Sequence, residues 1–592
     1  MEKGKRFDRQ SLIFAAALSL CFGLLVFFFS PMEIVYGNQQ DFSANASDIL
    51  PPMLLLALAV SGGLMLLLTA ALLIHRRVFF VLSRIFFGLT LAFYVQSLFL
   101  NGSMHQITGD GLYSGSTAGM VINAVIFFAA FAAPTVIGIV SAKKKLAEGN
   151  GFLKYLPAYL CGVIIVMQVF GFTDSMHKAS AEDAVKAYDE VFTYAPLTSL
   201  SKDKNTVVFL IDRFDGGWCD ELLEKYPELN DKLGGFTYYR NNISHYTNTF
   251  PSLPSTLTKY YFDDYDYGSK TEYLNAAWDR RTLPDILKEN GAVMNLAVDG
   301  STAYSSVSQL SGRCGNLVSS EGMRDGFNSF GKNGILFTMS RLSLAKLAPY
   351  CLKFAFAGNM GSDLATGFIR YTKEAEGEII PSFVGVSSDL KFNGYITAHG
   401  LNADSPKPTV NFIHLNGSHS VSERVSKLYY GDNAFDADVY TTTRGEFEIL
   451  FGYFDEMKRL GVYDSSTIII FADHGRVHDE IDFEDKEHIE HTNISTLMVK
   501  PAGADTSEPL AADSTSELTN DYLAASVLEY MGIDHSEFGY SYNDIISGGL
   551  HIDRIFNPFS WKVGGRFKKL SIYRVTGDAR DFSNWQETDN NN

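Results

Sequence analysis

Five long apolar stretches in the first 175 residues limit what this chain can fold into. They lie at about 11–31, 50–74, 78–100, 119–141 and 153–173. A helix needs about 20 mostly apolar residues to cross a bilayer, and each stretch has that length. A cleaved signal peptide is a poor alternative for the first stretch, because four more apolar stretches follow it. We therefore predict a membrane domain of five transmembrane helices over residues 1–175.

Positive charge collects on alternate loops of this membrane domain. Lys and Arg fall in the N-terminal segment, in the turn after the second stretch and around the loop after the fourth. They are Lys3, Lys5, Arg6, Arg9, Arg76, Arg77, Lys143, Lys144, Lys145 and Lys154. The segments 32–49 and 101–118 hold none. Because cytoplasmic loops are rich in Lys and Arg, the N-terminus is predicted to be cytoplasmic, and five spans then place the rest of the chain outside, extracellular or periplasmic.

The remainder of the chain is acidic. Residues 1–175 hold 11 Lys/Arg and 8 Asp/Glu, so the formal charge of −18 for the whole chain leaves −21 for residues 176–592. This charge argues against nucleic acid as a partner, because phosphate binding requires clustered Lys and Arg. It is compatible with a domain that holds a divalent cation, although solubility alone explains most of it. The five cysteines show no CxxC spacing and predict no zinc–cysteine site.

After a linker at 176–203, short apolar strands alternate with helix-like segments. The strand patterns are TVVFLID from residue 206, AVMNLAVDG from 292, PTVNFIHLNG from 408 and STIIIFADHG from 466. Apolar strands between helices predict a mainly parallel sheet sandwiched by helices. Residues 204–592 are therefore predicted to form one extracytoplasmic α/β domain, and its ligands should gather beyond the carboxyl ends of the strands.

Residue types that bind metals stand at three of these strand ends. Asp212 ends the first pattern, His414 and His419 lie in FIHLNGSH, and Asp473 and His474 lie in IIIFADHG. Mixed carboxylate and imidazole ligands suit zinc or manganese better than calcium or magnesium. Taken singly, each residue is more often a turn or cap residue, and only their joint occurrence indicates a metal site.

A candidate nucleophile lies between the first two strands. Thr249 stands in HYTNTFPSLPSTLTK, where an extended segment meets a helix-like one. A hydroxyl bound to a divalent metal loses its proton more readily and can act as a nucleophile near neutral pH.

The order of these motifs resembles the sulfatase/alkaline-phosphatase superfamily. Thr249-Phe250-Pro251-Ser252 followed by Leu257-Thr258-Lys259 keeps the offsets of the sulfatase nucleophile motif. FIHLNGSH resembles the histidine segment of lipid A phosphoethanolamine transferases. Five spans before an outside catalytic domain resemble both those transferases and lipoteichoic acid synthases. The resemblance implies an alkaline-phosphatase-like fold for the catalytic domain.

The resemblance also implies roles for single residues. The matched metal ligands are Asp212, Thr249, Asp473 and His474, with Thr249 also the catalytic nucleophile, and the matched substrate-binding residues are His419 and His491. The implied cofactor is one divalent ion, manganese or zinc. Leu415 stands where phosphodiesterases have an Asp for a second metal, so a second ion is not expected.

The resemblance further implies an activity. Thr cannot be the precursor of the formylglycine that sulfatases need, whereas it can attack phosphorus. The leading hypothesis is a phosphotransferase that moves a phosphoglycerol- or phosphoethanolamine-like group from a membrane phospholipid to a cell-surface glycan or glycolipid. The alternatives are a sulfatase-like phosphodiesterase or hydrolase of envelope substrates, and a catalytically silent surface protein.

Overall fold

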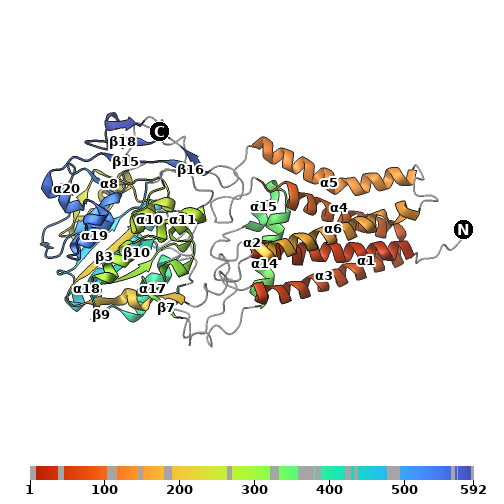
Figure 1. The fold of residues 1–592 in the computed structure, drawn as a ribbon, viewed down its shortest axis with the longest axis horizontal. Coiled ribbons are helices and arrows are strands. Elements are labelled where there is room, and N and C mark those ends of the chain that lie inside the picture. Colours follow the sequence, from red (N-terminus) through yellow and green to blue (C-terminus); the bar gives the residue numbers. More distant parts are fainter. Residues whose placement is uncertain are drawn as a thin grey trace. The chain divides into compact units, whose positions relative to one another are not determined.

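The computed structural model divides the chain into two compact units (Figure 1). The residues it describes are 9–37, 46–102, 117–143, 151–178, 190–262, 270–319, 332–357, 379–380, 388–419, 428–431, 438–475, 494–561, 567–569 and 571–588. The first unit takes residues 1–188, 323–371 and 563–565, and the second takes 189–322, 372–562 and 566–592.

The first unit contains five helices that are long and apolar enough to cross a membrane, which confirms the five predicted spans. The first span runs continuously through α1 (Arg9–Leu24), a π-helical turn (Leu25–Phe29) and α2 (Ser30–Gly37). The others are α3 (Ala46–Ile74), α4 (Arg76–Phe99), α5 (Thr117–Lys143) and α6 (Gly151–Lys178). Large apolar side chains are exposed along them, as expected of helices that face lipid.

Two further helices, α14 (Lys332–Leu347) and α15 (Tyr350–Ala357), also belong to the first unit. The sequence prediction assigned them to the catalytic domain over 204–592. The physical reason for the difference is apolar packing, because Met339 of α14 shares a buried cluster with Met53 of α3. The chain therefore returns to the membrane unit in the middle of the catalytic sequence.

The second unit is built on a seven-stranded sheet in the order β13–β4–β12–β11–β3–β10–β6. The strands are β3 (Asn205–Ile211), β4 (Thr237–Tyr239), β6 (Val293–Ala297), β10 (Thr409–Leu415), β11 (Thr467–Phe471), β12 (Leu497–Lys500) and β13 (Ala511–Asp513). Only β12 runs against its neighbours among these seven strands. The prediction of a mainly parallel sheet is therefore confirmed.

Helices and short strands surround this sheet. The helices of the second unit are α8 (Gly216–Lys225), α9 (Glu228–Lys232), α10 (Thr249–Thr258), α11 (Lys270–Trp278), α12 (Leu283–Glu289), α13 (Gly300–Ala303), α17 (Asp389–His399), α18 (Val439–Leu460), α19 (Leu523–Tyr530) and α20 (Tyr542–Gly548). The short strands are β1 (Glu190–Thr193), β2 (Ser199–Ser201), β5 (Asn242–Ile243), β7 (Leu317–Ser319), β8 (Ile379–Ile380), β9 (Asn402–Ser405), β14 (Leu518–Thr519), β15 (Arg554–Phe556), β16 (Phe559–Trp561), β17 (Phe567–Lys569), β18 (Tyr573–Val575) and β19 (Trp585–Glu587). Strands β1 and β2 lie within the predicted linker.

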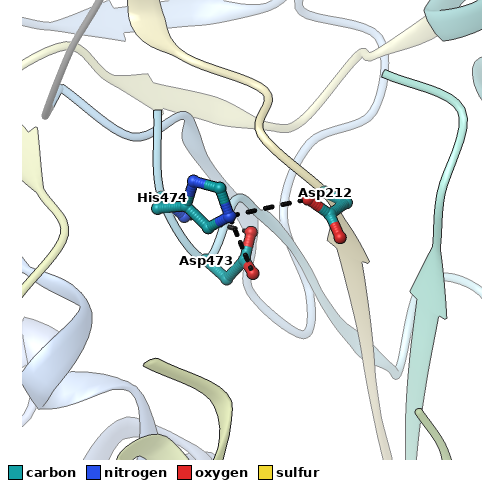
Figure 2. A group of neighbouring side chains, drawn as sticks. All are labelled: Asp212, Asp473 and His474. Atoms are coloured by element: carbon teal, nitrogen blue, oxygen red, sulfur yellow. Dashed lines mark hydrogen bonds and ion pairs between the residues drawn. The ribbon is translucent and has the colours of Figure 1, made fainter. Parts of the chain in front are cut away.

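The three central strands end at the same edge of the sheet. Leu210 of β3 pairs with His414 of β10 on one side and with Phe471 of β11 on the other. Asp212 directly follows β3, and Asp473 follows β11 by two residues. Figure 2 shows that the side chains after these strands point toward one another. The parallel register thus brings residues far apart in the chain to one place.

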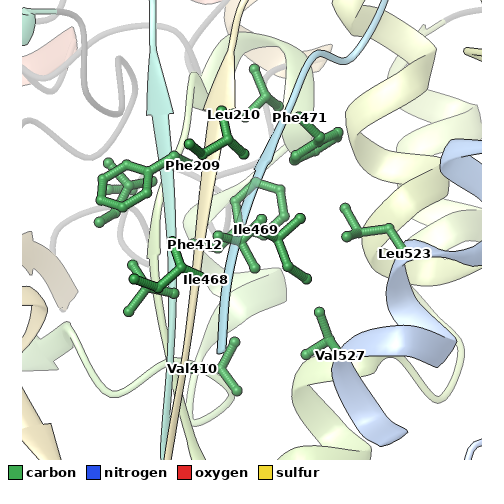
Figure 3. Packing of buried hydrophobic residues seen from close by; sticks show 14 of the residues in the cluster. Phe209, Leu210, Val410, Phe412, Ile468, Ile469, Phe471, Leu523 and Val527 are labelled. Carbon is green, nitrogen blue, oxygen red and sulfur yellow. The ribbon is translucent and has the colours of Figure 1, made fainter. Parts of the chain in front are cut away.

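The core on both faces of the sheet makes this edge rigid. All seven residues of β3 are buried. Phe209 contacts Tyr453 and Phe454 of α18, with ring centroids 5.5 and 6.1 Å apart. Leu523 and Val527 of α19 belong to the same buried cluster and lie beside the strands in Figure 3. Each fully buried side chain of this size contributes roughly 1.5–3 kcal/mol, so the strand ends are held firmly.

Candidate active site

Three buried side chains meet at the carboxyl edge of the sheet. Each of Asp212, Asp473 and His474 offers one ligand atom, and these atoms all lie within 4.8 Å of one another. His474 Nε2 lies 3.7 Å from Asp212 Oδ1 and 3.6 Å from Asp473 Oδ2 (Figure 2). All three residues are at most 3% exposed. Two carboxylates and an imidazole gathered at such depth require either shared protons or a cation.

Thr249 joins this group from the start of α10. Asn248 before it is extended, with φ −141° and ψ 152°, and Phe250 after it is also non-helical, with φ −94° and ψ 123°, so Thr249 stands at the bend where the chain enters the helix. The Thr249 hydroxyl lies 3.4 Å from Asp212 Oδ2, to which it can donate, and 3.3 Å from His474 Nε2. The structure therefore brings together all four residues that the sequence predicted as metal ligands.

The donor set fits one divalent metal ion. Asp212 Oδ1 and Asp473 Oδ2 are buried and have no hydrogen-bond partner within the described part of the chain. Ligands bonded at about 2.1 Å to one tetrahedral ion lie about 3.4 Å apart. The separations of His474 Nε2 from Thr249 Oγ1, Asp212 Oδ1 and Asp473 Oδ2, which are 3.3, 3.7 and 3.6 Å, are close to that size. Oxygen and imidazole donors in this arrangement suit zinc or manganese.

The ring of His474 is oriented to present a lone pair to this point. Its Nδ1 lies 2.7 Å from the carbonyl oxygen of Gly475, so Nδ1 carries the proton and donates it there. Nε2 is then unprotonated and faces the two carboxylates. Burial lowers the pKa of His474 to about 4, so the imidazole is neutral at pH 7, as a metal ligand must be.

The two carboxylates differ in their protonation. Burial and the neighbouring charge of Asp212 raise the pKa of Asp473 to about 7. Burial opposes the ionisation of Asp212 as well, but nearby imidazoles, His419 first among them, outweigh it and hold its pKa below the ordinary range. Without a cation the pair therefore tends to keep one negative charge, and a divalent ion would relieve the repulsion between two.

His414 supports Asp212 from the neighbouring strand. It is fully buried, and its Nε2 lies 3.1 Å from Asp212 Oδ2. Its Nδ1 accepts from the backbone N–H of Asp299 at 3.5 Å, so Nε2–H is the group that donates to the carboxylate. A histidine that fixes a ligand carboxylate in this way sets the ligand's orientation. The sequence marked His414 as a ligand type without a role, although strand pairing places it on the same face as Asp212.

Arg213 is a site residue that sequence reasoning missed. Its backbone N–H donates to Asp473 Oδ1 at 3.3 Å, and its guanidinium Nη1 donates to the carbonyl of His419 at 2.9 Å. Its φ of 61° is unusual for a side chain larger than Gly. Its position directly after Asp212 was the signal that the sequence offered. The contacts of Arg213, however, are with Asp473 and His419, which lie in two distant segments. Arg213 therefore links the backbone of His419 to Asp473 of the candidate ligand cluster.

Buried acids hold the turn that carries His419. Asp389 Oδ1 accepts from the backbone N–H of Asn416 at 3.0 Å, and Glu446 accepts from the N–H of Gly417. A Cβ at Gly417 would meet the Glu446 carboxyl carbon at 2.2 Å, so a larger residue there would displace the Glu446 side chain. The predicted substrate-binding residue His491 lies outside the described residues.

Comparisons with known proteins identify a family for this chain. Residues 204–533 match the Sulfatase family model. A search of curated proteins finds no match. Among solved structures, the lipooligosaccharide phosphoethanolamine transferase A (EptA) of Neisseria meningitidis is 13% identical, with 89% of this chain and 96% of that chain covered and a TM-score of 0.30.

Two other solved structures give similar values. The lipoteichoic acid synthase LtaP of Listeria monocytogenes is 10% identical, with 67% of this chain and 86% of that chain covered and a TM-score of 0.34. A sulfatase of Bacteroides thetaiotaomicron, from a locus for glycosaminoglycan metabolism, is 12% identical, with 63% and 85% covered and a TM-score of 0.38. The family model spans more than half of the chain and includes all four converging residues. The chain therefore belongs to the sulfatase family, in a form that carries five candidate membrane-spanning helices.

Proposed function

We propose that this protein is a membrane-anchored, metal-dependent phosphotransferase. Its reaction moves a phosphoglycerol- or phosphoethanolamine-like group from a phospholipid to a cell-surface glycan or glycolipid. The observation that carries the proposal is the position of Thr249 Oγ1, 3.3 Å from His474 Nε2 and 3.4 Å from Asp212 Oδ2. A hydroxyl beside a buried ligand cluster is suited to nucleophilic attack.

In the first step Thr249 Oγ attacks the phosphorus of the phospholipid phosphodiester. A bond forms between Oγ and phosphorus, and the bond from phosphorus to the diacylglycerol oxygen breaks. The hydroxyl proton of Thr249 passes to a neighbouring carboxylate, such as Asp212, whose Oδ2 lies 3.4 Å from the hydroxyl. The diacylglycerol oxygen takes up one proton, and we assign the supply of that proton to His419. The product on the protein is a phosphodiester of Thr249.

A divalent manganese or zinc ion held by Asp212, Thr249, Asp473 and His474 would supply Lewis-acid stabilisation of the phosphate charge and favour the alkoxide of Thr249. The protein's own contribution is orientation. The hydrogen bond from Nδ1 to Gly475 fixes the ring of His474, and His414 fixes the carboxylate of Asp212. His474 and His414 are buried, so the groups beside the partly exposed hydroxyl of Thr249 are held in fixed positions.

In the second step an acceptor hydroxyl attacks the phosphorus and frees Thr249. A glycan or glycolipid hydroxyl gives transfer, whereas water gives hydrolysis. The membrane spans favour a lipid donor, because they hold the protein in the bilayer that contains phospholipids and so raise their effective concentration. Membership of the sulfatase family keeps hydrolysis of envelope substrates as the second candidate function.

Mass spectrometry of the purified protein tests this proposal. The full chain is incubated with manganese and mixed phospholipids, and peptides containing Thr249 are analysed, with Thr249→Ala as the control. We expect an added mass on Thr249 that names the transferred group and persists until a glycan acceptor is supplied. Loss of that mass in buffer alone, with a water-soluble product, would favour the hydrolase. Lipid turnover without any adduct, and equal in the control, would contradict the covalent mechanism.

A further inference from the structure

The segment formed by α14 and α15, which we call the insert (332–357), lies across one end of the spans. Figure 1 shows both helices at the end of the first unit away from the N-terminus. The buried cluster here joins α14 to the first span and to α3. Its members are Phe28, Phe29, Met32, Val35, Ile49, Met53, Ala57, Ile335, Met339, Leu342 and Ala345.

A hydrogen bond fixes how deep the insert reaches along the first span. The Ser343 hydroxyl donates to the carbonyl of Val26, in the π-helical turn, where the backbone hydrogen-bond pattern changes. Val26 lies 11 residues before Gly37, the last residue of α2, or about 16 Å along the helix. The whole span is 29 residues long. At about 1.5 Å per residue it measures about 43 Å, and the hydrocarbon core is about 30 Å thick.

This comparison places Ser343 at hydrocarbon depth. The span exceeds the core by only about 13 Å, shared between its two ends. Even if all of the excess lay at the Gly37 end, Val26 would still lie inside the hydrocarbon region, and a tilted span would bring it deeper. A helix that touches Val26 directly is therefore beside acyl chains and not in the water above them.

The exposed side chains of the insert are those expected in lipid. Of residues 334–356 whose exposure the structure describes, the exposed ones are Phe337, Leu352 and Ala355. Phe337 is 68% exposed and Leu352 is 44% exposed. No charged side chain is exposed in that described stretch, whereas a helix surface in water is normally rich in charge.

The polar groups of the insert find partners within the protein. Lys346 pairs with Glu33 of α2 at 2.6 Å, and both side chains are about one-fifth exposed or less. Lys353 Nζ donates to the carbonyls of Ala345 and Lys346 at 2.6 and 2.9 Å, which completes the end of α14. Such internal pairing is what a medium without water demands of charged groups.

Asparagine side chains join the insert to the spans in the same way. Asn123 Oδ1 of α5 accepts from the backbone N–H of Tyr350 at 3.0 Å, at the start of α15. Asn101 Nδ2, just after α4, donates to the carbonyl of Lys346 at 3.0 Å. Polar partners of the insert therefore come from two spans, through Glu33 and Asn123, and from Asn101 just after a third.

We propose that the insert is a membrane-embedded element whose partner is the phospholipid bilayer. Phe337 and Leu352 contact the acyl chains of the leaflet at the Gly37 end of the spans, and the opposite face packs on the span ends. The catalytic sequence thus has a second attachment to the membrane, far along the chain from the last span. This inference does not depend on the proposed phosphotransfer.

Tryptophan fluorescence in vesicles tests the proposal. The variants Phe337→Trp and Leu352→Trp are made in the full chain and reconstituted into phosphatidylcholine vesicles with and without brominated acyl chains. The four native tryptophans are subtracted by measuring the parent protein in parallel. Tyr540→Trp, at a 49% exposed aromatic position of the second unit, is the matched control.

We expect brominated lipid to reduce the added emission of both insert variants at least about twofold and to leave the control unchanged. Quenching of the insert variants by aqueous acrylamide alone would place these positions in water and overturn the proposal. Quenching by neither reagent would mean that protein, such as a second copy of the chain, covers the surface, and would overturn it as well. Two variants at separate helices guard against one that folds poorly.

Discussion

The hydroxyl of Thr249 lies 3.3 Å from Nε2 of His474, although 225 residues separate the two in the chain. The contact exists because α10 begins beside the carboxyl end of β3, while His474 follows the adjacent strand β11. The hydrogen bond from Nδ1 to Gly475 turns Nε2 toward the hydroxyl. The proposed nucleophile and a neutral imidazole therefore lie side by side at the edge of the sheet, and the following predictions start from that geometry.

Asp473→Asn should weaken manganese or zinc binding by about 100-fold or more, because it removes a charged ligand from the cluster. The metal-free variant should be at least as stable as the metal-free parent, since the buried like-charged pair with Asp212 is lost. Isothermal titration with the metal and thermal unfolding measure the two effects. Asp404→Asn, an exposed carboxylate on β9, is the control and should change neither. Undiminished metal affinity in Asp473→Asn would contradict the assigned site.

Metal affinity should rise with pH up to about 7 and then level off. Burial and the charge of Asp212 raise the pKa of Asp473 to about 7, so below that pH a proton competes with the ion for this carboxylate. His474, with its pKa lowered to about 4 by burial, is already neutral and adds no dependence near pH 7. One pH unit below the pKa, affinity should be about tenfold weaker.

Titrations in two buffers of different ionisation enthalpy count the protons released. Close to one proton should leave per ion bound at about pH 6 and almost none at about pH 8. In Asp473→Asn the metal affinity should be lower than in the parent and should no longer change with pH over this range. A steady loss of affinity on going from pH 6 to pH 8 would be opposite in sign and would refute this assignment.

Arg213→Gln should lower turnover while leaving the metal in place. The guanidinium holds the carbonyl of His419, and a hydrogen bond from a charged donor contributes roughly 1.5–3 kcal/mol, which predicts a loss of about tenfold or more. The backbone N–H that binds Asp473 remains in the variant. Arg240→Gln is the control, because Arg240 pairs with Asp220 away from the ligand cluster. Equal metal affinity with reduced turnover is the expected pattern, and loss of metal would assign Arg213 to the ligand framework instead.

Labelling of engineered cysteines should show that the turn between α3 and α4 and the C-terminal segment lie on opposite sides of the membrane. Positive loop charges predict a cytoplasmic turn between α3 and α4 and an outside C-terminus. In intact cells an impermeant maleimide should therefore label Glu587→Cys and not Arg77→Cys, both at exposed positions. The background replaces Cys351, which is partly exposed. The reverse labelling pattern would refute the predicted orientation.

The spans and the sheet could be predicted because their segments are continuous apolar runs of characteristic length. The first span and α3 are apolar over about the length that a bilayer requires, and β3 is apolar throughout. Parallel strands end together, so Asp212 and Asp473 could be expected to converge once their strands were recognised. Thr249 was predicted as a site residue because the spacing of its motif resembles that of the sulfatase nucleophile motif. The binding of a metal by these residues stays a prediction.

The insert and Arg213 could not be predicted, for different physical reasons. With 16 residues, α14 is shorter than a span, and its Lys332, Arg341 and Lys346 are typical of a soluble helix. Its place in the first unit depends on partners such as Glu33, which lies far away in the chain. In the sequence Arg213 cannot be distinguished from a surface cation. Its role becomes visible only in the folded chain, where its guanidinium donates to the carbonyl of His419. In both cases the position of the residues is determined by contacts between segments that are far apart in the chain.

Thr249→Ala should abolish turnover while the fold and most of the metal affinity remain. The variant removes the hydroxyl that lies against Asp212 Oδ2 and His474 Nε2, so the rate should fall by about a thousandfold or more. The cost in unfolding free energy should stay below about 1 kcal/mol, because the side chain is placed for chemistry and not in the apolar core. Thr249→Ser keeps the oxygen and should retain partial activity, although the missing methyl group loosens its rotamer.

Other hydroxyls on α10 provide the matched comparison, because they are committed to the helix itself. Ser255 and Thr256 both donate to the carbonyl of Ser252, at 2.9 and 2.8 Å. Thr256→Ala is the same chemical change seven residues away from Thr249, and it should keep activity within about threefold of the parent. Turnover is measured as lipid product released, and metal content by titration. If Thr249→Ala stays active while Ser252→Ala does not, the nucleophile lies elsewhere on the segment. Full activity in Thr249→Ala, Ser252→Ala, Ser255→Ala and Thr256→Ala would contradict a covalent intermediate on any of these four hydroxyls.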